Sequence, residues 1–241
     1  MTRDSVSRGS RDYAPVIRDH LRSDILSGSL LPGSQISQAQ VAIEFGVSRG
    51  PVREAFRLLE RDGLIDARVN HRARVTRLSV DDLEHLYALR VVNESLALAV
   101  SAPSFTNDDL DELEVLAHEL GQTRTASFVF DEWEEVHQRF HTLLVSHGGS
   151  RMVDSVAGWA AHTQRYRRAY ADEGRRLPEG AAEHAVLARL CRDRDGERAA
   201  PLLAQHLSRA ALTLIAQMAP AHDPLLLSAA VRQVAGPDDR R

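Results

Sequence analysis

The chain has 241 residues, with 30 basic side chains against 34 acidic ones, 11 histidines and one cysteine. A single cysteine excludes an intramolecular disulfide framework and a cysteine-rich zinc finger, and 43% apolar residues with mixed charge are typical of a globular protein. No apolar run reaches the roughly 20 residues needed to cross a bilayer, and the N-terminus lacks the apolar core of a secretory signal, so we expect a cytoplasmic protein without a membrane partner.

Three short helices are predicted at the start of the chain. Apolar residues at helical spacing indicate a first helix that ends near Gly28. A capping-box pattern at Ser37 begins the second helix, and Gly46 ends it. Ser48 can cap the third helix, which runs to about residue 62 and stops at Gly63.

Two short strands follow these helices, over residues 64–69 and 73–78, around a basic tip at residues 70–72. Three helices followed by a two-stranded ribbon describe a winged helix-turn-helix. We therefore expect a disordered N-terminus over residues 1–12 and a winged helix-turn-helix DNA-binding domain over residues 13–78.

The third helix carries three arginines that point to DNA. Arg49 and Arg53 are four residues apart and share a face, and Arg57 continues that face. A guanidinium group there can bind a guanine edge bidentately or contact a phosphate. The alternative is an ordinary surface helix in which these arginines pair with neighbouring acidic residues.

The residues Leu31-Pro32-Gly33 and the run FGVSRGPVREAFRLLERDGLI over residues 45–65 resemble the GntR family of bacterial transcriptional regulators. The resemblance covers about residues 14–78 and implies a winged helix that binds a palindromic operator as a homodimer. It implies that Arg49 and Arg53 contact bases and phosphates and that Ser48 contacts the DNA backbone. The chain departs from the family at the wing, where His71-Arg72-Ala73 replaces the usual glycine. Either Arg72 adds a minor-groove or phosphate contact, or the tip is built differently.

From Ser79 onward the pattern is helical throughout, and the balance of charge changes sign. Residues 1–78 hold 13 arginines against 9 acidic residues, whereas residues 79–241 hold 17 against 25. This asymmetry favours a polyanion partner for the first part alone. We expect an all-α antiparallel helical bundle over residues 79–219 and a tail over residues 220–241, in which Leu225 to Val231 can form a short helix. The expected bundle helices lie near residues 79–102, 107–121, 127–146, 151–173, 181–193 and 196–218.

Four histidines of the bundle form a candidate metal site. His137 and His141 are one helical turn apart on or beside an apolar face, which provides half of such a site. His184 and His206 lie on later helices between apolar residues, and neighbouring antiparallel helices would let all four rings converge. The alternative is that the histidines are hydrogen-bonded core residues.

The motifs Leu89-Arg90 with Glu94, HQRFH over residues 137–141, Glu183-His184 and His206 resemble, in that order, the FCD effector domain of the FadR subgroup of GntR regulators. The resemblance covers about residues 80–218. Many such domains bind a divalent metal through one aspartate and three histidines, and a carboxylate effector completes the coordination. His141, His184 and His206 fall on the three histidines, and His137 falls on the aspartate. A fourth imidazole makes the site softer and favours zinc, nickel or copper, of which we favour zinc or nickel.

Arg90 is the candidate effector-binding residue. It lies on an apolar stripe and is expected to face the bundle interior, where a guanidinium needs an anionic partner. That partner is either the effector carboxylate or Glu94, one helical turn away.

The sequence thus predicts a mainly α protein that is not an enzyme. We expect a DNA-binding repressor that responds to a small organic acid at a metal site. Two alternatives stay open. One is an effector-free DNA binder with structural core histidines. The other is a metallohydrolase tethered to DNA, which the absence of an HExxH motif disfavours.

Overall fold

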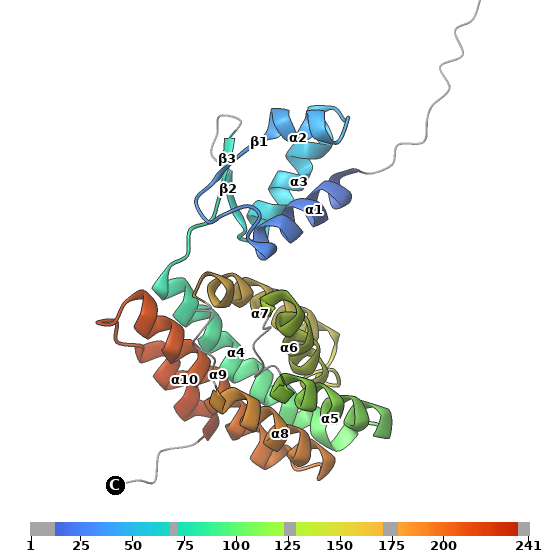
Figure 1. Ribbon diagram of the computed structural model, residues 1–241, viewed down its shortest axis with the longest axis vertical. Helices are drawn as coiled ribbons and strands as arrows, with labels where there is room; N and C mark the ends of the chain where they lie inside the picture. Colours follow the sequence, from blue (N-terminus) through green and yellow to red (C-terminus); the bar gives the residue numbers. More distant parts are fainter. Residues whose placement is uncertain (1–12, 68–71, 123–128, 171–177, 236–241) are drawn as a thin grey trace, which may run out of the picture. The chain divides into compact units, whose positions relative to one another are not determined.

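The chain divides into two structural units, residues 1–77 and 78–241, with a boundary one residue from the expected one. A computed structural model describes residues 13–67, 72–122, 129–170 and 178–235 (Figure 1). The expected N-terminal tail over residues 1–12 and most of the wing tip lie outside the described residues.

The first unit contains helices and a small sheet. Its helices are α1 (Tyr13–Ser27), α2 (Gln38–Glu44) and α3 (Arg49–Arg61), and its strands are β1 (Gln35–Ser37), β2 (Ile65–Ala67) and β3 (Arg72–Val75). The strands form an antiparallel sheet in the order β1-β3-β2, in which Ile36 faces Ala73. The sequence pattern did not predict β1, because three residues are too few for an alternating pattern to be recognised.

The turn between α2 and α3 is built as the sequence predicts. The Ser37 hydroxyl accepts a hydrogen bond from the Gln40 backbone N–H at 3.4 Å, which caps α2. Gly46 has φ +63°, a conformation that glycine adopts without steric cost. Helix α1 packs against α3. The apolar face of α3 is buried and consists of Val52, Ala55, Phe56 and Leu59.

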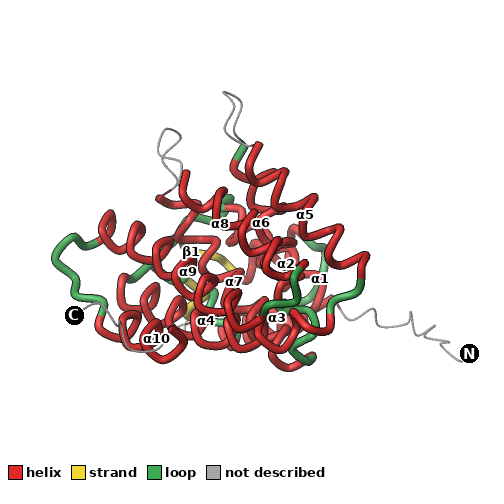
Figure 2. Tube along the Cα trace, turned by 90° about the horizontal axis from the view of Figure 1, so that it is seen from below, coloured by secondary structure: helices red, strands yellow, loops and turns green. Residues whose placement is uncertain are grey.

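The second unit is helical throughout its described residues (Figures 1 and 2). Helix α4 packs against α7, α9 and α10, whereas α5 packs against α6 and α8. Gly196 opens α9 in close approach to α4, where an added Cβ would lie 2.6 Å from the Ala99 carbonyl oxygen. The helices are α4 (Val80–Ser101), α5 (Asn107–Gln122), α6 (Phe130–Leu144), α7 (Ser150–Tyr170), α8 (Pro178–Arg192), α9 (Gly196–Met218) and α10 (Leu225–Ala235), with a short 3-10 helix at Ala102–Ser104.

The segment expected to be a tail is part of the helical unit up to residue 235. Glu84 of α4 accepts hydrogen bonds from the Leu226 and Leu227 backbone N–H groups, at 2.7 and 3.1 Å, and so caps α10. Leu227 and Ala230 are buried in the core. The domain boundary at 219 therefore leaves out a helix that the bundle holds by both capping and packing.

These elements confirm the expected fold class, which is mainly α with an N-terminal helix-turn-helix and a helical second unit. Among the described residues, no helix has the length and apolar character required to cross a membrane.

Candidate metal centre and nucleic-acid interface

Helix α3 presents its arginines on the face opposite its buried side chains. Arg49 and Arg53 are exposed, as is Ser48, which precedes the helix as its N-cap residue. The Ser48 hydroxyl makes no capping hydrogen bond with the helix. An exposed helix N-terminus with a hydroxyl and two guanidinium groups has the chemistry that DNA phosphates and base edges require.

Arg57 is also exposed, and it has an acidic partner on its own helix. Its Nη2 lies 2.6 Å from Glu54 Oε1, and its Nε donates to Glu54 Oε2 at 3.0 Å. Arg57 therefore has the arrangement of an ordinary surface helix, in which an arginine pairs with a neighbouring acidic residue. The Arg72 side chain lies outside the described residues, so its expected wing contact is not located.

The four histidines converge from three helices of the second unit. His137 and His141 come from α6, His184 from α8 and His206 from α9. Each offers one ring nitrogen, and these four atoms all lie within 4.8 Å of one another. This spacing would let all four nitrogens bind one metal ion at their centre, as in a tetrahedral metal site.

These four imidazoles are buried, and burial lowers the pKa of three of them. It lowers the pKa of His137 and of His184 well below the ordinary value of 6.5. The pKa of His141 falls to about 4, because burial lowers it more than Glu94 raises it. Neutral imidazole is the form that binds a metal, so His137, His141 and His184 are in the metal-binding form at neutral pH.

The hydrogen-bonding state of the cluster fits a metal ion. Both ring nitrogens of His184 and Nδ1 of His137 are buried and have no hydrogen-bond partner among the described residues. Leaving a buried polar group unpaired costs about 1–3 kcal/mol. A metal ion bound to the cluster would satisfy one nitrogen of each ring. If the histidines were only structural core residues, these nitrogens would stay without a partner.

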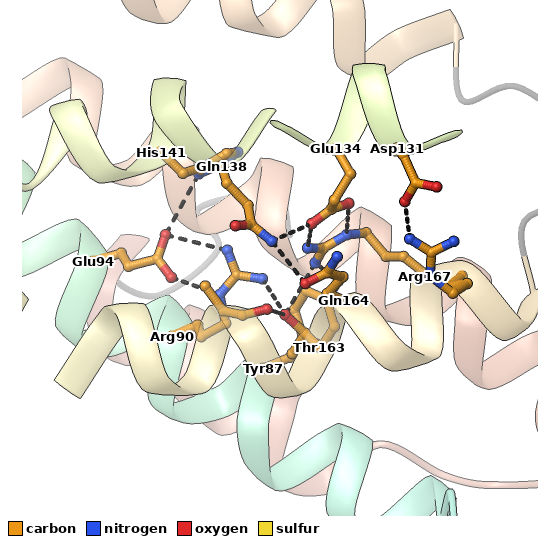
Figure 3. A network of polar contacts seen from close by, with 12 residues as sticks. Tyr87, Arg90, Glu94, Asp131, Glu134, Gln138, His141, Thr163, Gln164 and Arg167 are labelled. Atoms are coloured by element: carbon orange, nitrogen blue, oxygen red, sulfur yellow. Dashed lines mark hydrogen bonds and ion pairs between the residues drawn. The ribbon is translucent and has the colours of Figure 1, made fainter. Parts of the chain in front are cut away.

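Arg90 lies next to the cluster but is occupied by Glu94. Its Nε donates to Glu94 Oε1 at 2.6 Å, and its Nη1 donates to Thr163 Oγ1 at 2.9 Å (Figure 3). Arg90 is 1% exposed and Glu94 is fully buried. Of the two partners expected for Arg90, the structure has the internal one. Arg90 thus holds an ion pair with Glu94, and its contact with an effector stays a prediction.

A second buried ion pair continues this network between α6 and α7. Arg167 donates to both carboxylate oxygens of Glu134, and its Nη1 donates to Thr163 Oγ1 at 3.0 Å (Figure 3). Gln138 Nε2 donates hydrogen bonds to Glu134 Oε1 and to Gln164 Oε1, each at 3.0 Å. Polar groups that the sequence pattern did not single out thus border the histidine cluster.

Two supporting residues of the cluster were missed from the sequence. Glu183 Oε2 lies 2.9 Å from His206 Nδ1, and Trp133 stacks on His137 with ring centroids 4.5 Å apart. In the sequence, Glu183 was identified only as the residue that precedes His184 in a motif. Its role depends on a contact between α8 and α9 that spacing does not reveal.

Comparison with known proteins places both units among bacterial regulators. Residues 14–75 match the model for bacterial regulatory proteins of the gntR family, and residues 85–209 match the FCD domain. YdhC of Bacillus subtilis (strain 168), named an HTH-type transcriptional regulator, is 36% identical over 57% of this chain and 62% of its own length. The HTH-type transcriptional repressor RspR of Escherichia coli (strain K12) is 28% identical over 78% of this chain and 82% of its length.

A solved structure has the same fold. That of E. coli McbR/YncC superposes with a TM-score of 0.70 at 18% identity, and covers 86% of this chain and 99% of the solved one. The chain resembles proteins named as transcriptional regulators over both of its units.

Proposed function

The chain belongs to the GntR family of bacterial transcriptional regulators and carries an FCD domain, and we propose that it is a metal-dependent repressor controlled by a small organic acid. In this proposal a homodimer binds a palindromic operator through two copies of α3. The helical unit binds the acid at a metal ion held by four histidines.

The DNA-binding part of the proposal rests on the surface of α3. Arg49 and Arg53 lie exposed in its first turns, where a recognition helix contacts base edges. We assign them base and phosphate contacts, Ser48 a backbone contact, and Arg57 a weaker phosphate contact because Glu54 competes for it. Arg72 is kept as a wing contact on the strength of its charge and position in sequence alone.

The observation that carries the sensing part is the cluster of four buried imidazoles, in which His137 and His184 have ring nitrogens without a hydrogen-bond partner among the described residues. His137, His141, His184 and His206 would hold the metal through one nitrogen each. When bound, the metal would supply a Lewis-acid centre for an oxygen ligand. Because the four ligands are neutral imidazoles, they favour zinc or nickel over magnesium or calcium.

The charges around the cluster favour an anionic effector. The two acidic side chains nearest the histidines are neutralised by arginines, Glu94 by Arg90 and Glu183 by Arg209. A divalent ion on four neutral rings would therefore keep most of its charge in a buried site, where an unpaired charge is costly. A small carboxylate that reaches the metal would offset that charge. The proposal does not require Arg90 to leave Glu94.

Repression and dimerisation are supported by likeness and by geometry. RspR, a similar chain over both units, is named as a repressor. A single helix-turn-helix reads one half-site, so a twofold dimer matches a palindromic operator.

The test uses a DNA duplex that the protein itself selects from a random-sequence pool. Carboxylic acids are screened by thermal shift against the full chain, with and without added zinc. We expect at least one acid to raise Tm only when zinc is present, and to lower the affinity for the selected duplex. Zinc binding without any responsive acid would contradict the effector proposal.

Reciprocity provides an internal control on any acid that the screen identifies. If the acid weakens duplex binding by some factor, the duplex must weaken acid binding by the same factor. Equal acid affinity with and without the duplex would show that the acid does not control DNA binding.

A further inference from the structure

Two of the four clustered histidines are backed by a carboxylate, and each carboxylate is in turn held by an arginine. His206 contacts Glu183, which pairs with Arg209. His141 lies near Glu94, which pairs with Arg90. The two arrangements use the same residue types, but their distances differ.

The arrangement behind His206 has the geometry of a well-formed hydrogen bond. His206 Nδ1 and Glu183 Oε2 are 2.9 Å apart, within the usual range for an N–H donor and a carboxylate oxygen. The other oxygen of Glu183 accepts from Arg209. With Nδ1 donating to Glu183, the lone pair of His206 is on Nε2.

The arrangement behind His141 is weaker. His141 Nδ1 lies 3.5 Å from Glu94 Oε2, whereas Arg90 Nε lies 2.6 Å from Glu94 Oε1. Arg90 donates to both Glu94 oxygens, the second at 3.5 Å, so Glu94 contacts the guanidinium more closely than the imidazole (Figure 3).

The remaining two histidines lack such support. His184 has no hydrogen-bond partner on either nitrogen among the described residues, and His137 Nδ1 has none. His206 is therefore the ring whose tautomer is set most firmly by the protein itself.

We propose that Glu183 is a positioning residue, which fixes the tautomer and orientation of His206 and thereby sets the metal affinity of the four-histidine cluster. This inference rests on the proposed metal site. A carboxylate that accepts from the far nitrogen of a metal-binding histidine orients the ring and raises its basicity. Glu94 gives His141 less of this support, since Arg90 holds it more closely.

A purely structural role would make different predictions. Glu183 joins α8 to α9 through His206 and Arg209, so its loss could loosen the packing of the two helices without affecting the ring itself. Loss of packing lowers the stability of the metal-free protein. Loss of positioning lowers metal affinity and alters the ligand geometry. Measurements of both quantities on the same variants separate the two roles.

The experiment compares Glu183→Ala and Glu183→Gln with the parent chain. Zinc affinity is measured by competition with a chromogenic chelator, and the visible spectrum of the cobalt(II) form reports the ligand geometry. We expect Glu183→Ala to weaken zinc binding by about 10–100-fold and to change the cobalt spectrum. Glu183→Gln keeps an oxygen acceptor for His206 Nδ1, so it should recover part of the affinity.

Glu114→Ala is the matched control. Glu114 also pairs with an arginine, Arg192, but the pair is on the surface between α5 and α8. Zinc affinity in this variant should equal that of the parent. Parent-like zinc affinity and cobalt spectrum in Glu183→Ala would overturn the proposal. Equal zinc losses in the Ala and Gln variants, tracking equal losses of metal-free stability, would also overturn it.

Nitrogen NMR of the parent keeps the proposal testable if Glu183→Ala fails to fold. In the metal-free parent His206 should carry its proton on Nδ1, and a proton on Nε2 would overturn the proposal. The two levels of inference fail separately. A parent that binds no zinc refutes the metal site, whereas a parent that binds zinc as tightly as its Glu183 variants refutes only the role of Glu183.

Discussion

Helix α3 and the histidine cluster place functional residues in opposite environments. Arg49 and Arg53 are exposed, and the apolar side chains that hold the helix in place lie on its other face. The four histidines are themselves part of a buried core, at 3–7% exposure. In the first region binding and folding depend on different residues, whereas in the second they depend on the same ones.

This difference has an energetic consequence. An exposed arginine keeps its hydration until DNA arrives, so it costs the free protein little. A buried imidazole with unpaired nitrogens destabilises the free protein until a ligand satisfies it. The surface site should therefore be separable from stability by mutation, and the buried site should not.

Phe56→Ala tests the inner face of α3 and should have the largest effect. Phe56 is 1% exposed, and truncation of a buried phenylalanine costs about 3–5 kcal/mol in free energy of unfolding. Denaturant unfolding of the first unit measures the loss. If stability were unaffected, the division of α3 into a supporting and a binding face would be wrong.

His184→Leu tests the coupling of binding and stability in the cluster. Without metal it should be as stable as the parent or more so, because it removes two unpaired nitrogens. With zinc at 100–1,000 times its Kd, the parent should gain roughly 2.7–4.1 kcal/mol and the variant should gain nothing. Thermal unfolding with and without zinc gives both values. His85→Ala, which removes an exposed histidine of α4, should behave as the parent does.

Arg49→Ala and Arg53→Ala test the outer face of α3. Each should weaken binding to the selected duplex by about 1–3 kcal/mol if it contacts a base, with Tm unchanged. Fluorescence anisotropy measures the affinity. Arg198→Ala removes an exposed arginine from the second unit and serves as the control. Unchanged duplex affinity in both α3 variants would refute the assignment of the recognition helix.

Glu54→Gln should have the smallest effect, and in the opposite direction. It removes a negative charge beside the duplex and releases Arg57 from a 2.6 Å ion pair. Binding to the selected duplex should become tighter, by less than either arginine variant weakens it, and should depend more steeply on salt. Weaker binding would mean that the Glu54–Arg57 pair itself positions the helix on DNA.

Local signals explain how much of the fold could be predicted. Capping residues, glycine stops and helical periodicity located the three helices of the first unit and six of the second within a few residues, since each signal acts over one or two turns. Strand β1 was too short to show a pattern. The apolar run from Leu225 to Val231 indicated that a short helix can form there, which α10 confirms. The cap that this helix receives from Glu84 could not be predicted, because Glu84 lies more than 140 residues earlier in the chain.

The candidate sites divide in the same way. The α3 arginines were found because they share one face of one helix. The histidines were found partly from spacing and partly from resemblance, and only the structure shows that three helices bring them together. The sequence pattern left Arg90 with two partners, and the structure shows the contact with Glu94. It missed Glu183 because the supporting role of this carboxylate comes from its contact with His206 on another helix, which the sequence does not show.

Metal content tests the central claim most directly. The chain is purified without an affinity tag, exposed to zinc or nickel, dialysed, and analysed for metal beside a His184→Leu/His206→Leu double variant. We predict one metal ion per chain in the parent and loss of that ion in the double variant. A parent that retains no metal, or a double variant that retains as much as the parent, would contradict the account.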